Sequence, residues 1–341
     1  MAEWMGPGAG DGLDALYRRA RPTLIGAVTR LLGPSHLDQV EAIVQEAFVA
    51  ALRTWGPRGA PENPEGWLVQ VAKNRALDWL RTGGRPERAA EGGEEEDGLA
   101  SLPAAGRGDP EATARLSGEL SDDQLAMMFV ACHPGLSRSA QVMLALRTLC
   151  GLEAAEIAAV LLSQEAAVEK QLVRARARLR EVGLSFDVPS GGELQARLPP
   201  VLTVLYVLFS EGYAPHGGDR AVREELCQEA LRLCRVLLDH PATRQPRVHA
   251  LAALMLLQAS RLRARTDERG QLRTLAEQDR SRWDGALIRQ GLEQLALSAA
   301  GDELTELHLE AGIAACHALA PSFDTTDWPR IVASYDQLLR L

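Results

Sequence analysis

The chain has 341 residues, of which 46% are hydrophobic and only 4% aromatic, and its formal net charge is −9 at pH 7. This length suffices for two or three domains with hydrophobic cores, and the Leu- and Ala-rich apolar content favours helices over sheets. The acidic balance excludes a uniformly basic nucleic-acid-binding protein but is compatible with a local basic patch.

Neither a signal peptide nor a membrane span is visible. Residues 1–10 lack a basic stretch followed by an apolar one, and the apolar runs at 201–209 and 250–257 fall short of the ~20 residues that cross a bilayer. We expect a soluble, cytoplasmic protein that has no membrane partner. The five cysteines form no C-x-x-C pair, so we expect buried free thiols rather than disulfides or a metal site.

Composition divides the chain into four parts: 11–85, 86–121, 122–184 and 190–341. We expect helices in all of them except the second, which is rich in Gly and Pro. Between residues 89 and 120, eight acidic residues stand against two basic ones, a net charge of −6. Such a segment buries too little surface to offset its ordering entropy. It is interpreted either as a solvated tether or as an acidic segment that occupies a basic channel.

The first clear helix covers residues 38–53. Apolar residues recur there at helical spacing, at positions 40, 43, 44, 47, 48, 51 and 52. Asp38 is predicted to be the N-cap, with Glu41 three residues later in a capping box, and Gly33-Pro34 and Gly56-Pro57 mark the ends. The opposite face carries polar residues: Glu41, Gln45 and Glu46.

A second helix is predicted from Pro64 to Arg81. Its inward residues are Leu68, Val71 and Ala72, and its outward residues are Gln70, Lys73, Asn74, Asp78 and Arg81. Its two tryptophans, Trp67 and Trp79, are interpreted either as core residues or as an exposed aromatic wedge.

Residues 154–181 have the pattern of a helix-turn-helix. A short helix at 154–161 is followed by a turn at Leu162-Ser163 and a longer helix at 164–181, whose inward residues are Val168, Leu172 and Leu179. The longer helix carries four arginines and one lysine, and arginine presents donors that match guanine edges and phosphates. It is either a DNA-reading helix or the solvated basic face of an ordinary helix.

Taken together, these segments resemble an extracytoplasmic-function sigma factor of the sigma-70 type. Residues 44–48 resemble the core-binding helix of region 2, and Trp67-Leu68 to Arg81 resemble the helix that recognises the −10 element. Gly151-Leu152, residues 155–158, Val168 and Arg174–Arg176 resemble the helix-turn-helix of region 4. The three segments in this order are more specific to the family than any one of them alone. Sigma factors often have an acid where Ala42 stands, so one predicted polymerase contact is weakened here. Helix-turn-helix turns often have a glycine where Leu162 stands, and a left-handed backbone there is strained for leucine.

This resemblance implies partners and site residues. The partners are core RNA polymerase, promoter DNA, and an anti-sigma or other regulatory protein. It implies polymerase binding through Asp38, Glu41, Gln45 and Glu46. It implies −10 binding through Trp67, Gln70, Lys73, Asn74, Arg75 and Arg81. It implies −35 binding through Glu169, Lys170, Gln171, Arg174, Arg176 and Arg178. The acidic linker is expected to thread the RNA channel of polymerase, or to cover the basic helix in the free protein.

The last part of the chain resembles the C-terminal extension of one sigma subgroup, which is similar to tetratricopeptide-type helical hairpins. The segments that carry this resemblance are 209–213, 277–284, 314–317 and 326–328. In that subgroup the extension usually continues beyond the position of Leu341. We expect a regulatory role, and we interpret 277–284 either as a hydrogen-bonded connection at an interface or as a helix-capping network.

Two other functions compete with this interpretation. One is a stand-alone helix-turn-helix regulator with a ligand- or partner-sensing helical domain, which would not need residues 38–82. The other is an enzyme in the C-terminal half that uses Cys316, His317 or the acids near Asp279. No nucleophile–base spacing, phosphate loop or metal motif supports the second, so we expect no enzymatic activity, no cofactor and no metal.

Overall fold

The computed structural model describes residues 9–83, 122–215 and 222–341, and the linker predicted at 86–121 lies outside these ranges. Within them the chain is helical, apart from one isolated antiparallel bridge between Thr266 and Leu272. The expectation of an all-α protein is confirmed for these residues. The chain divides into two compact units. The N-terminal unit comprises Met1–Glu153 and Glu169–Val188, and the C-terminal unit comprises Ala154–Val168 and Pro189–Leu341.

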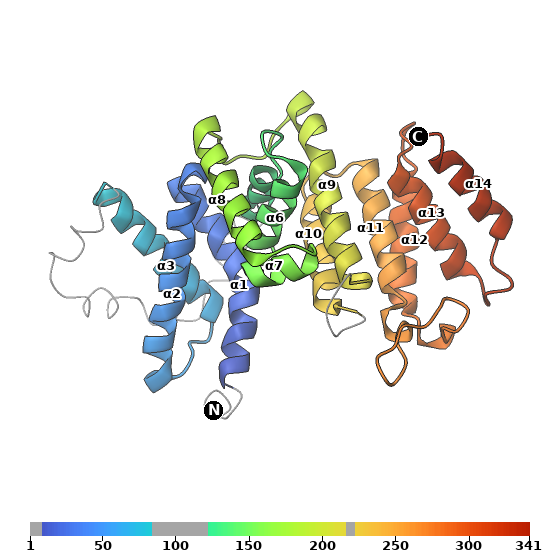
Figure 1. Ribbon diagram of the computed structural model, residues 1–341, viewed down its shortest axis with the longest axis horizontal. Helices are drawn as coiled ribbons and strands as arrows, with labels where there is room; N and C mark the ends of the chain where they lie inside the picture. Colours follow the sequence, from blue (N-terminus) through green and yellow to red (C-terminus); the bar gives the residue numbers. More distant parts are fainter. Residues whose placement is uncertain (1–8, 84–121, 216–221) are drawn as a thin grey trace. The chain divides into compact units, whose positions relative to one another are not determined.

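Three helices open the N-terminal unit (Figure 1). They are α1 (Ala9–Leu32), α2 (Leu37–Arg58) and α3 (Pro64–Arg81), with a short 3-10 turn at Pro34–His36 between the first two. Each of the three helices packs against the other two. Their apolar residues form a core in which Ile25, Val40 and Leu68 are completely buried.

The structure corrects both predicted ends of α2. The helix begins at Leu37, directly after the 3-10 turn, so Asp38 lies inside the helix and is not its N-cap. The expected capping box does not form, because the Asp38 carboxylate pairs with arginines far along the chain instead. At the other end the helix continues past Gly56-Pro57 to Arg58 and stops at Gly59, whose φ is 79°. The predicted apolar stripe is buried except for Leu52, which is 59% exposed.

The prediction for α3 is confirmed at both ends. The side chain of Asn63 caps the helix by accepting a hydrogen bond from the N–H of Gly66 at 2.9 Å. Pro64 occupies the first turn, where its missing N–H costs nothing. Leu68, Val71 and Ala72 are buried, as expected.

The rest of the N-terminal unit is also helical. Residues 122–131 form a helix, and residues 125–132 are all buried. Close packing against α1 is possible because Gly26 lacks a side chain: a Cβ there would lie 3.2 Å from Cβ of Asp123. α6 (Arg138–Thr148) follows, capped by Ser137. Arg30 of α1 pairs with Asp123 and lies over the ring of Phe186.

The two helices of the expected helix-turn-helix are present as α7 (Ala154–Val160) and α8 (Glu165–Val182). Val168, Leu172 and Leu179 of α8 are buried, as the spacing predicts. Leu162 in the turn between them has a φ of 48° and is 69% exposed. The turn therefore keeps the left-handed backbone despite its leucine. The division between the two compact units falls inside α8, whereas the sequence predicts a separate part at 122–184.

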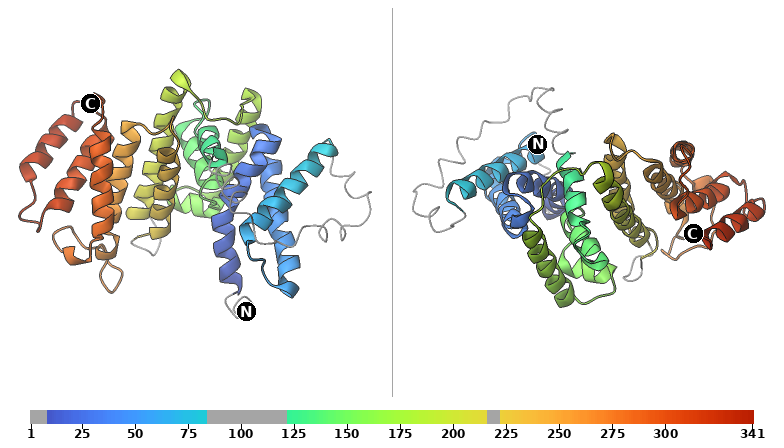
Figure 2. Two further views of the ribbon diagram at one scale, coloured as in Figure 1. Left: turned by 180° about the vertical axis from the view of Figure 1, so that it is seen from behind. Right: turned by 90° about the horizontal axis from the view of Figure 1, so that it is seen from above.

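The C-terminal unit continues as consecutive antiparallel helices (Figure 2). α9 packs on α10, α10 on α11, α11 on both α12 and α13, and α13 on α14. A cluster of small and branched residues of α11 and α13 fills the centre, including Leu257 and Ala311. The helices are α9 (Gly191–Tyr213), α10 (Glu224–Asp239), α11 (Pro246–Ala259), α12 (Gly285–Ser298), α13 (Glu306–Leu319) and α14 (Trp328–Leu338).

The glycine in the segment 209–213 lets α9 and α10 approach closely. A Cβ on Gly212 would lie 2.7 Å from the backbone nitrogen of Cys227 and 2.8 Å from the carbonyl oxygen of Arg223. The carbonyl of Gly212 also accepts a hydrogen bond from the N–H of Arg223 at 2.7 Å. The first hairpin of the C-terminal unit therefore requires glycine at this position.

The polar segment 277–284 caps two helical elements. Asp279 accepts from the N–H of Ser281 at the start of a 3-10 turn, and Asp284 accepts from two N–H groups at the start of α12. Arg280 donates to the carbonyls of His317 and Ala320 at 2.6 and 2.8 Å. The segment is thus a capping network that also connects α12 to the end of α13 within the same unit. All five cysteines are free, and all but Cys150 are buried.

Candidate functional site

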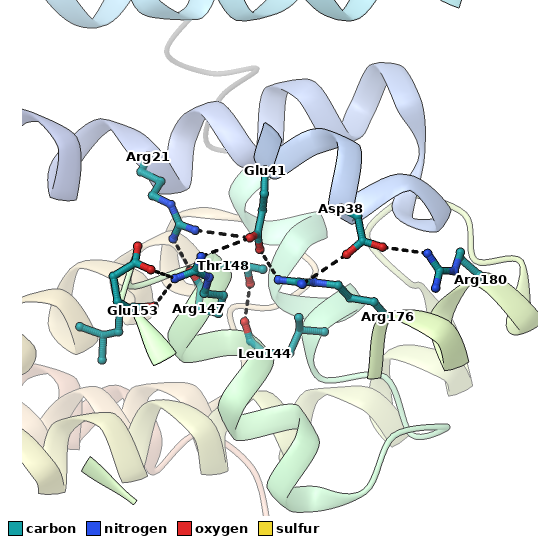
Figure 3. Close-up of polar contacts among 10 residues, drawn as sticks. Arg21, Asp38, Glu41, Leu144, Arg147, Thr148, Glu153, Arg176 and Arg180 are labelled. Carbon is teal, nitrogen blue, oxygen red and sulfur yellow. Dashed lines mark hydrogen bonds and ion pairs between the residues drawn. The ribbon is translucent and has the colours of Figure 1, made fainter. Parts of the chain in front are cut away.

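Two acidic side chains of α2 pair with two arginines of α8 in the N-terminal unit (Figure 3). Nη1 of Arg176 lies 3.3 Å from Oδ1 of Asp38, and its Nη2 donates to Oε1 of Glu41 at 2.6 Å. Nη1 of Arg180 donates to Oδ2 of Asp38 at 2.8 Å. Residues three apart share a helix face, so one guanidinium bridges both acids. We call these four residues the α2–α8 ion cluster.

Glu41 also pairs with arginines of two other helices. Its Oε2 lies 3.4 Å from Nη2 of Arg147 on α6 and 3.8 Å from Nη2 of Arg21 on α1. Arg21 donates through Nη1 to the backbone carbonyl of Arg147 at 2.7 Å, and Arg147 also pairs with Glu153. A single carboxylate therefore connects α1, α2, α6 and α8.

The inner and outer parts of the cluster differ in burial. The side chains of Glu41 and Arg176 are only 12% and 13% exposed, whereas those of Asp38 and Arg180 are 53% and 49% exposed. Exposed pairs contribute about 0–1 kcal/mol because water screens them. Removing one partner of a buried pair costs about 3–5 kcal/mol, since a charge is left without compensation. The contacts of Glu41 should therefore matter most for stability.

The pKa of Arg147 shows the effect of this environment. Burial by itself lowers the pKa of the guanidinium, but the carboxylates of Glu41 and Glu153 outweigh burial and raise the pKa above its ordinary value. The nearby phenol of Tyr17 has a raised pKa, chiefly because of burial. The arginine therefore stays charged, and the neutral phenol adds no charge to the cluster.

The remaining two residues predicted to bind polymerase lie farther along α2. Gln45 and Glu46 are both exposed. Oε2 of Glu46 accepts from Nη1 of Arg75 on α3 at 2.7 Å, in a pair whose side chains are 52% and 38% exposed. Of the four residues predicted to bind polymerase, Asp38 and Glu41 form ion pairs with arginines of α8. Glu46 forms an ion pair with Arg75, which is itself predicted to bind the −10 element.

The residues predicted to bind the −10 element are divided between faces of α3. Trp67, Gln70, Asn74 and Arg81 follow helical spacing and share one face, while Lys73 and Arg75 lie off it. Nε2 of Gln70 donates to Oδ1 of Asn74 at 2.9 Å. Arg81 pairs with Asp78, and Trp67 is half-buried with its ring edge-on to Trp55 at 5.3 Å. One face of α3 is therefore polar, with the ring of Trp67 at its N-terminal end.

The residues predicted to bind the −35 element are also divided. Glu169, Lys170, Arg174 and Arg178 are exposed on α8. Gln171 is half-buried, and Arg176 points towards α2 in the ion cluster. In this structure Arg176 is therefore unavailable to DNA.

Sequence reasoning missed Arg21, Arg147 and Glu153 as members of this network. The only local signal is an arginine within an apolar helix, such as Arg147 after Leu144-Ala145-Leu146, which must find a partner when buried. The partner itself, Glu41, lies 106 residues away in the chain, so no helical period could identify it.

The described residues contain no group of three or more His, Cys, Asp or Glu side chains that could hold a metal ion. Across the same ranges, none of the helices has the length and hydropathy needed to cross a membrane.

Comparison with known families gives two matches. Residues 16–85, which contain most of α1 with α2 and α3, match sigma-70 region 2. Residues 197–299 match a family of unknown function, DUF6596. No solved structure matches the chain.

Three relatives illustrate the similarity along the chain. An uncharacterised protein of Rhizobium meliloti, R00370, is 36% identical over 331 residues, which cover 96% of this chain and 76% of the relative. The probable ECF RNA polymerase sigma factor SigI of Mycobacterium tuberculosis is 27% identical over 179 residues, covering 52% of this chain and 58% of that protein. The probable RNA polymerase sigma factor RfaY of Xanthomonas campestris is 30% identical over 190 residues, covering 54% and 45%.

These matches confirm the predicted region 2 and support a sigma factor role. Sigma factors are transcription initiation factors rather than enzymes, so the expectation of a non-enzymatic protein is also confirmed. Region 4, the tetratricopeptide-like character of the C-terminal unit and the individual site residues stay predictions.

Proposed function

Because the chain belongs to one family with the Rhizobium meliloti protein and carries the region 2 domain of sigma-70 factors, we propose that it binds core RNA polymerase and directs it to promoters. The match of residues 16–85 to region 2 carries this proposal. We further propose that the protein acts in the cytoplasm, where polymerase and promoter DNA are found.

The polar face of α3 suits the −10 element. Its Gln70 and Asn74 carry amides that can read base edges, and Trp67 lies at the start of the same face. Unpaired bases stack on aromatic rings and bond to such amides, because their edges are no longer paired. We infer that this face of α3 holds the separated strand, with Lys73, Arg75 and Arg81 near phosphates.

The exposed side of α8 suits the −35 element. A helix of this diameter fits the major groove, with residues of its N-terminal half on base edges. Glu169, Lys170 and Arg174 are exposed there, and Arg178 follows one turn later. We infer that the first three read bases and that Arg178 contacts a phosphate. Gln171 and Arg176 would join them only after a change in their surroundings.

We propose that the C-terminal unit modulates this activity. Its helical hairpins resemble arrays that bind partner proteins along an extended surface, and residues 197–299 belong to a matched family of their own. An anti-sigma or other regulatory protein is the partner expected at that unit.

Reconstituted transcription tests the proposal. The full chain should co-elute with purified core polymerase and should support run-off transcription from members of a promoter library. A stand-alone regulator would bind DNA but would not be retained by polymerase, and that result would refute the sigma function.

A substitution on α8 tests the assignment of the −35 site. Arg174→Ala should weaken promoter use by about 5- to 150-fold and relax preference at one base pair, because a bidentate base contact is worth about 1–3 kcal/mol. Arg178→Ala should instead lower all promoters alike. Equal losses on every sequence for Arg174→Ala would contradict its role in reading bases.

A further inference from the structure

We propose that the C-terminal unit binds a phosphate group at a cluster of arginines and aromatic rings. Three arginines of this unit lie around two rings, one at the end of α9 and one in the segment 277–284. We call these five residues the arginine cluster: Tyr213, Arg261, Arg265, Arg280 and Trp283. The inference goes beyond the proposed sigma function and does not depend on it.

The two rings hold the three guanidinium groups close together. Cζ of Arg261 lies 5.7 Å from the centre of the Tyr213 ring and 5.8 Å from the centre of the Trp283 ring. Cζ of Arg265 lies 3.7 Å from the centre of the Tyr213 ring. Cζ of Arg280 lies 4.4 Å from the centre of the Trp283 ring. A ring attracts a cation through its face but does not neutralise it, so the N–H groups at the edges of the guanidinium groups can still donate.

Three positive charges therefore lie together without a negative one. Across the described parts of the chain, none of the three arginines of the cluster forms an ion pair with a carboxylate. Burial lowers the pKa of the Arg261 guanidinium, and the charges of Arg265 and Arg280 lower it further. A bound anion would offset both effects, since it would compensate the buried charge and screen the repulsion between the cations.

The acids of the segment 277–284 do not supply this missing charge, because the backbone and a hydroxyl already use them. Glu277 accepts from the N–H and the hydroxyl of Thr274. Asp279 caps the 3-10 turn that follows it, and Asp284 caps α12. The segment therefore contributes a cation to the cluster while its carboxylates serve as caps.

Buried polar atoms at the cluster lack hydrogen-bond partners among the described residues. They include Nη2 of Arg280 and Nε1 of Trp283, a residue that is only 9% exposed. Nδ1 of His317, whose carbonyl accepts from Arg280 at 2.6 Å, is a third such atom. A buried donor without a partner is costly. Because arginine and tryptophan only donate, the group that would satisfy them is an acceptor, and beside three cations it should be an anion.

Charge and shape favour a phosphate group over a carboxylate. A phosphate monoester carries a charge of about −1.5 to −2 at pH 7 and has three acceptor oxygens, whereas a carboxylate carries a single charge on two oxygens. The arginines come from three places in the chain: Arg261 follows α11, Arg265 follows the 3-10 turn at Leu262–Ala264, and Arg280 begins a second such turn. A group with three oxygens can accept from all of them.

One side of the cluster is open to solvent. Tyr213, Arg265 and Arg280 are half-buried, whereas Arg261 is only 8% exposed. A phosphate group can therefore reach the two outer arginines from the surface, with the buried Arg261 behind them. Arg261 also donates to Oε1 of Gln258, which orients its guanidinium before any ligand binds.

Thermal unfolding of the full chain in phosphate provides the first test. About 10 mM inorganic phosphate should raise the melting temperature by about 2–5 °C relative to sodium chloride of equal ionic strength, as expected when a ligand is near ten times its dissociation constant. Arg265→Gln should lose this rise, because it removes an outer cation of the cluster. Arg269→Gln is the matched control: it removes an exposed charge from the same segment and should keep the rise.

The control matters because phosphate stabilises many proteins simply by being excluded from their surfaces. An equal rise in the wild type and in both variants would be this general effect, and it would overturn the proposal. Calorimetric titration of the folded chain is a second measurement that does not involve unfolding. Arg265→Gln should weaken the affinity for inorganic phosphate at least about tenfold, and the absence of saturable binding to the wild type would also overturn the site.

Two further titrations identify the source of the phosphate group. Glucose 6-phosphate represents an ester of a small metabolite, and citrate represents a carboxylate ligand. Tighter binding of glucose 6-phosphate than of inorganic phosphate would assign the site to an ester, and equal binding would assign it to the free ion. Tighter binding of citrate than of either would contradict the choice of phosphate. None of these measurements involves polymerase, so failure of the phosphate site and failure of the sigma function are distinguishable.

Discussion

Replacing Glu41 by Gln should destabilise the N-terminal unit more than any other removal of a single carboxylate on α2. The substitution keeps the shape of the side chain and removes the charge that faces Arg176 at 2.6 Å, Arg147 at 3.4 Å and Arg21 at 3.8 Å. Arg147 keeps Glu153, and Arg176 keeps Asp38. Arg21, whose side chain is 1% exposed, loses its carboxylate.

We expect a loss of about 3 kcal/mol, the lower end of the cost of breaking a buried pair, because Glu41 itself keeps 12% exposure. Urea unfolding of the full chain, followed by hydrogen exchange in peptides of α2, measures this loss. Glu46→Gln is the matched control, and it should cost about 0–1 kcal/mol because its pair with Arg75 is exposed to solvent.

Salt separates the two effects further. Raising the ionic strength to about 1 M should reduce the small loss in Glu46→Gln, since the Debye length then falls to about 3 Å and an exposed pair is screened. The loss in Glu41→Gln should persist. If the two variants differ by less than about 1 kcal/mol at low salt, then burial does not govern this network and the reasoning is refuted.

Three further predictions concern positions in the C-terminal unit. Gly212→Ala should destabilise it by about 1–3 kcal/mol, because the new Cβ would meet the backbone of Cys227 at 2.7 Å; Gly192→Ala on the same helix, which has open space, should be neutral or stabilising in the same thermal melt. Leu162→Gly should stabilise the turn by about 0.5–1 kcal/mol, since leucine is strained at a φ of 48° and little apolar burial is lost. Burial lowers the pKa of His317, with Arg261 and Arg280 adding to the effect. In the unfolded chain this histidine therefore binds a proton at a higher pH than in the folded chain, so stability should fall as pH drops below about 6.5. His317→Gln should reduce that fall in urea midpoints measured between neutral and acid pH.

Local sequence signals predicted α3 well, and the reason lies in its ends. Asn63, Pro64 and the turn after Arg81 act within a few residues of the helix they delimit, so they can be recognised without knowing the fold. The buried positions of α8 could be predicted from the sequence equally well, because Val168, Leu172 and Leu179 recur at helical spacing.

The start of α2 shows where such reasoning fails. Asp38 and Glu41 have the spacing of a capping box, and that local pattern competes with contacts to residues more than 130 positions away. The distant arginines determine where both carboxylates point. Periodicity predicts which face of a helix is polar, but it does not predict whether that face meets solvent or an opposite charge.

The arginine content of the chain suits carboxylate bridges of this kind. Of 37 basic residues only Lys73 and Lys170 are lysines, so 35 are arginines. A lysine at position 176 would place one point charge between Asp38 and Glu41, whereas the planar guanidinium pairs with both at once.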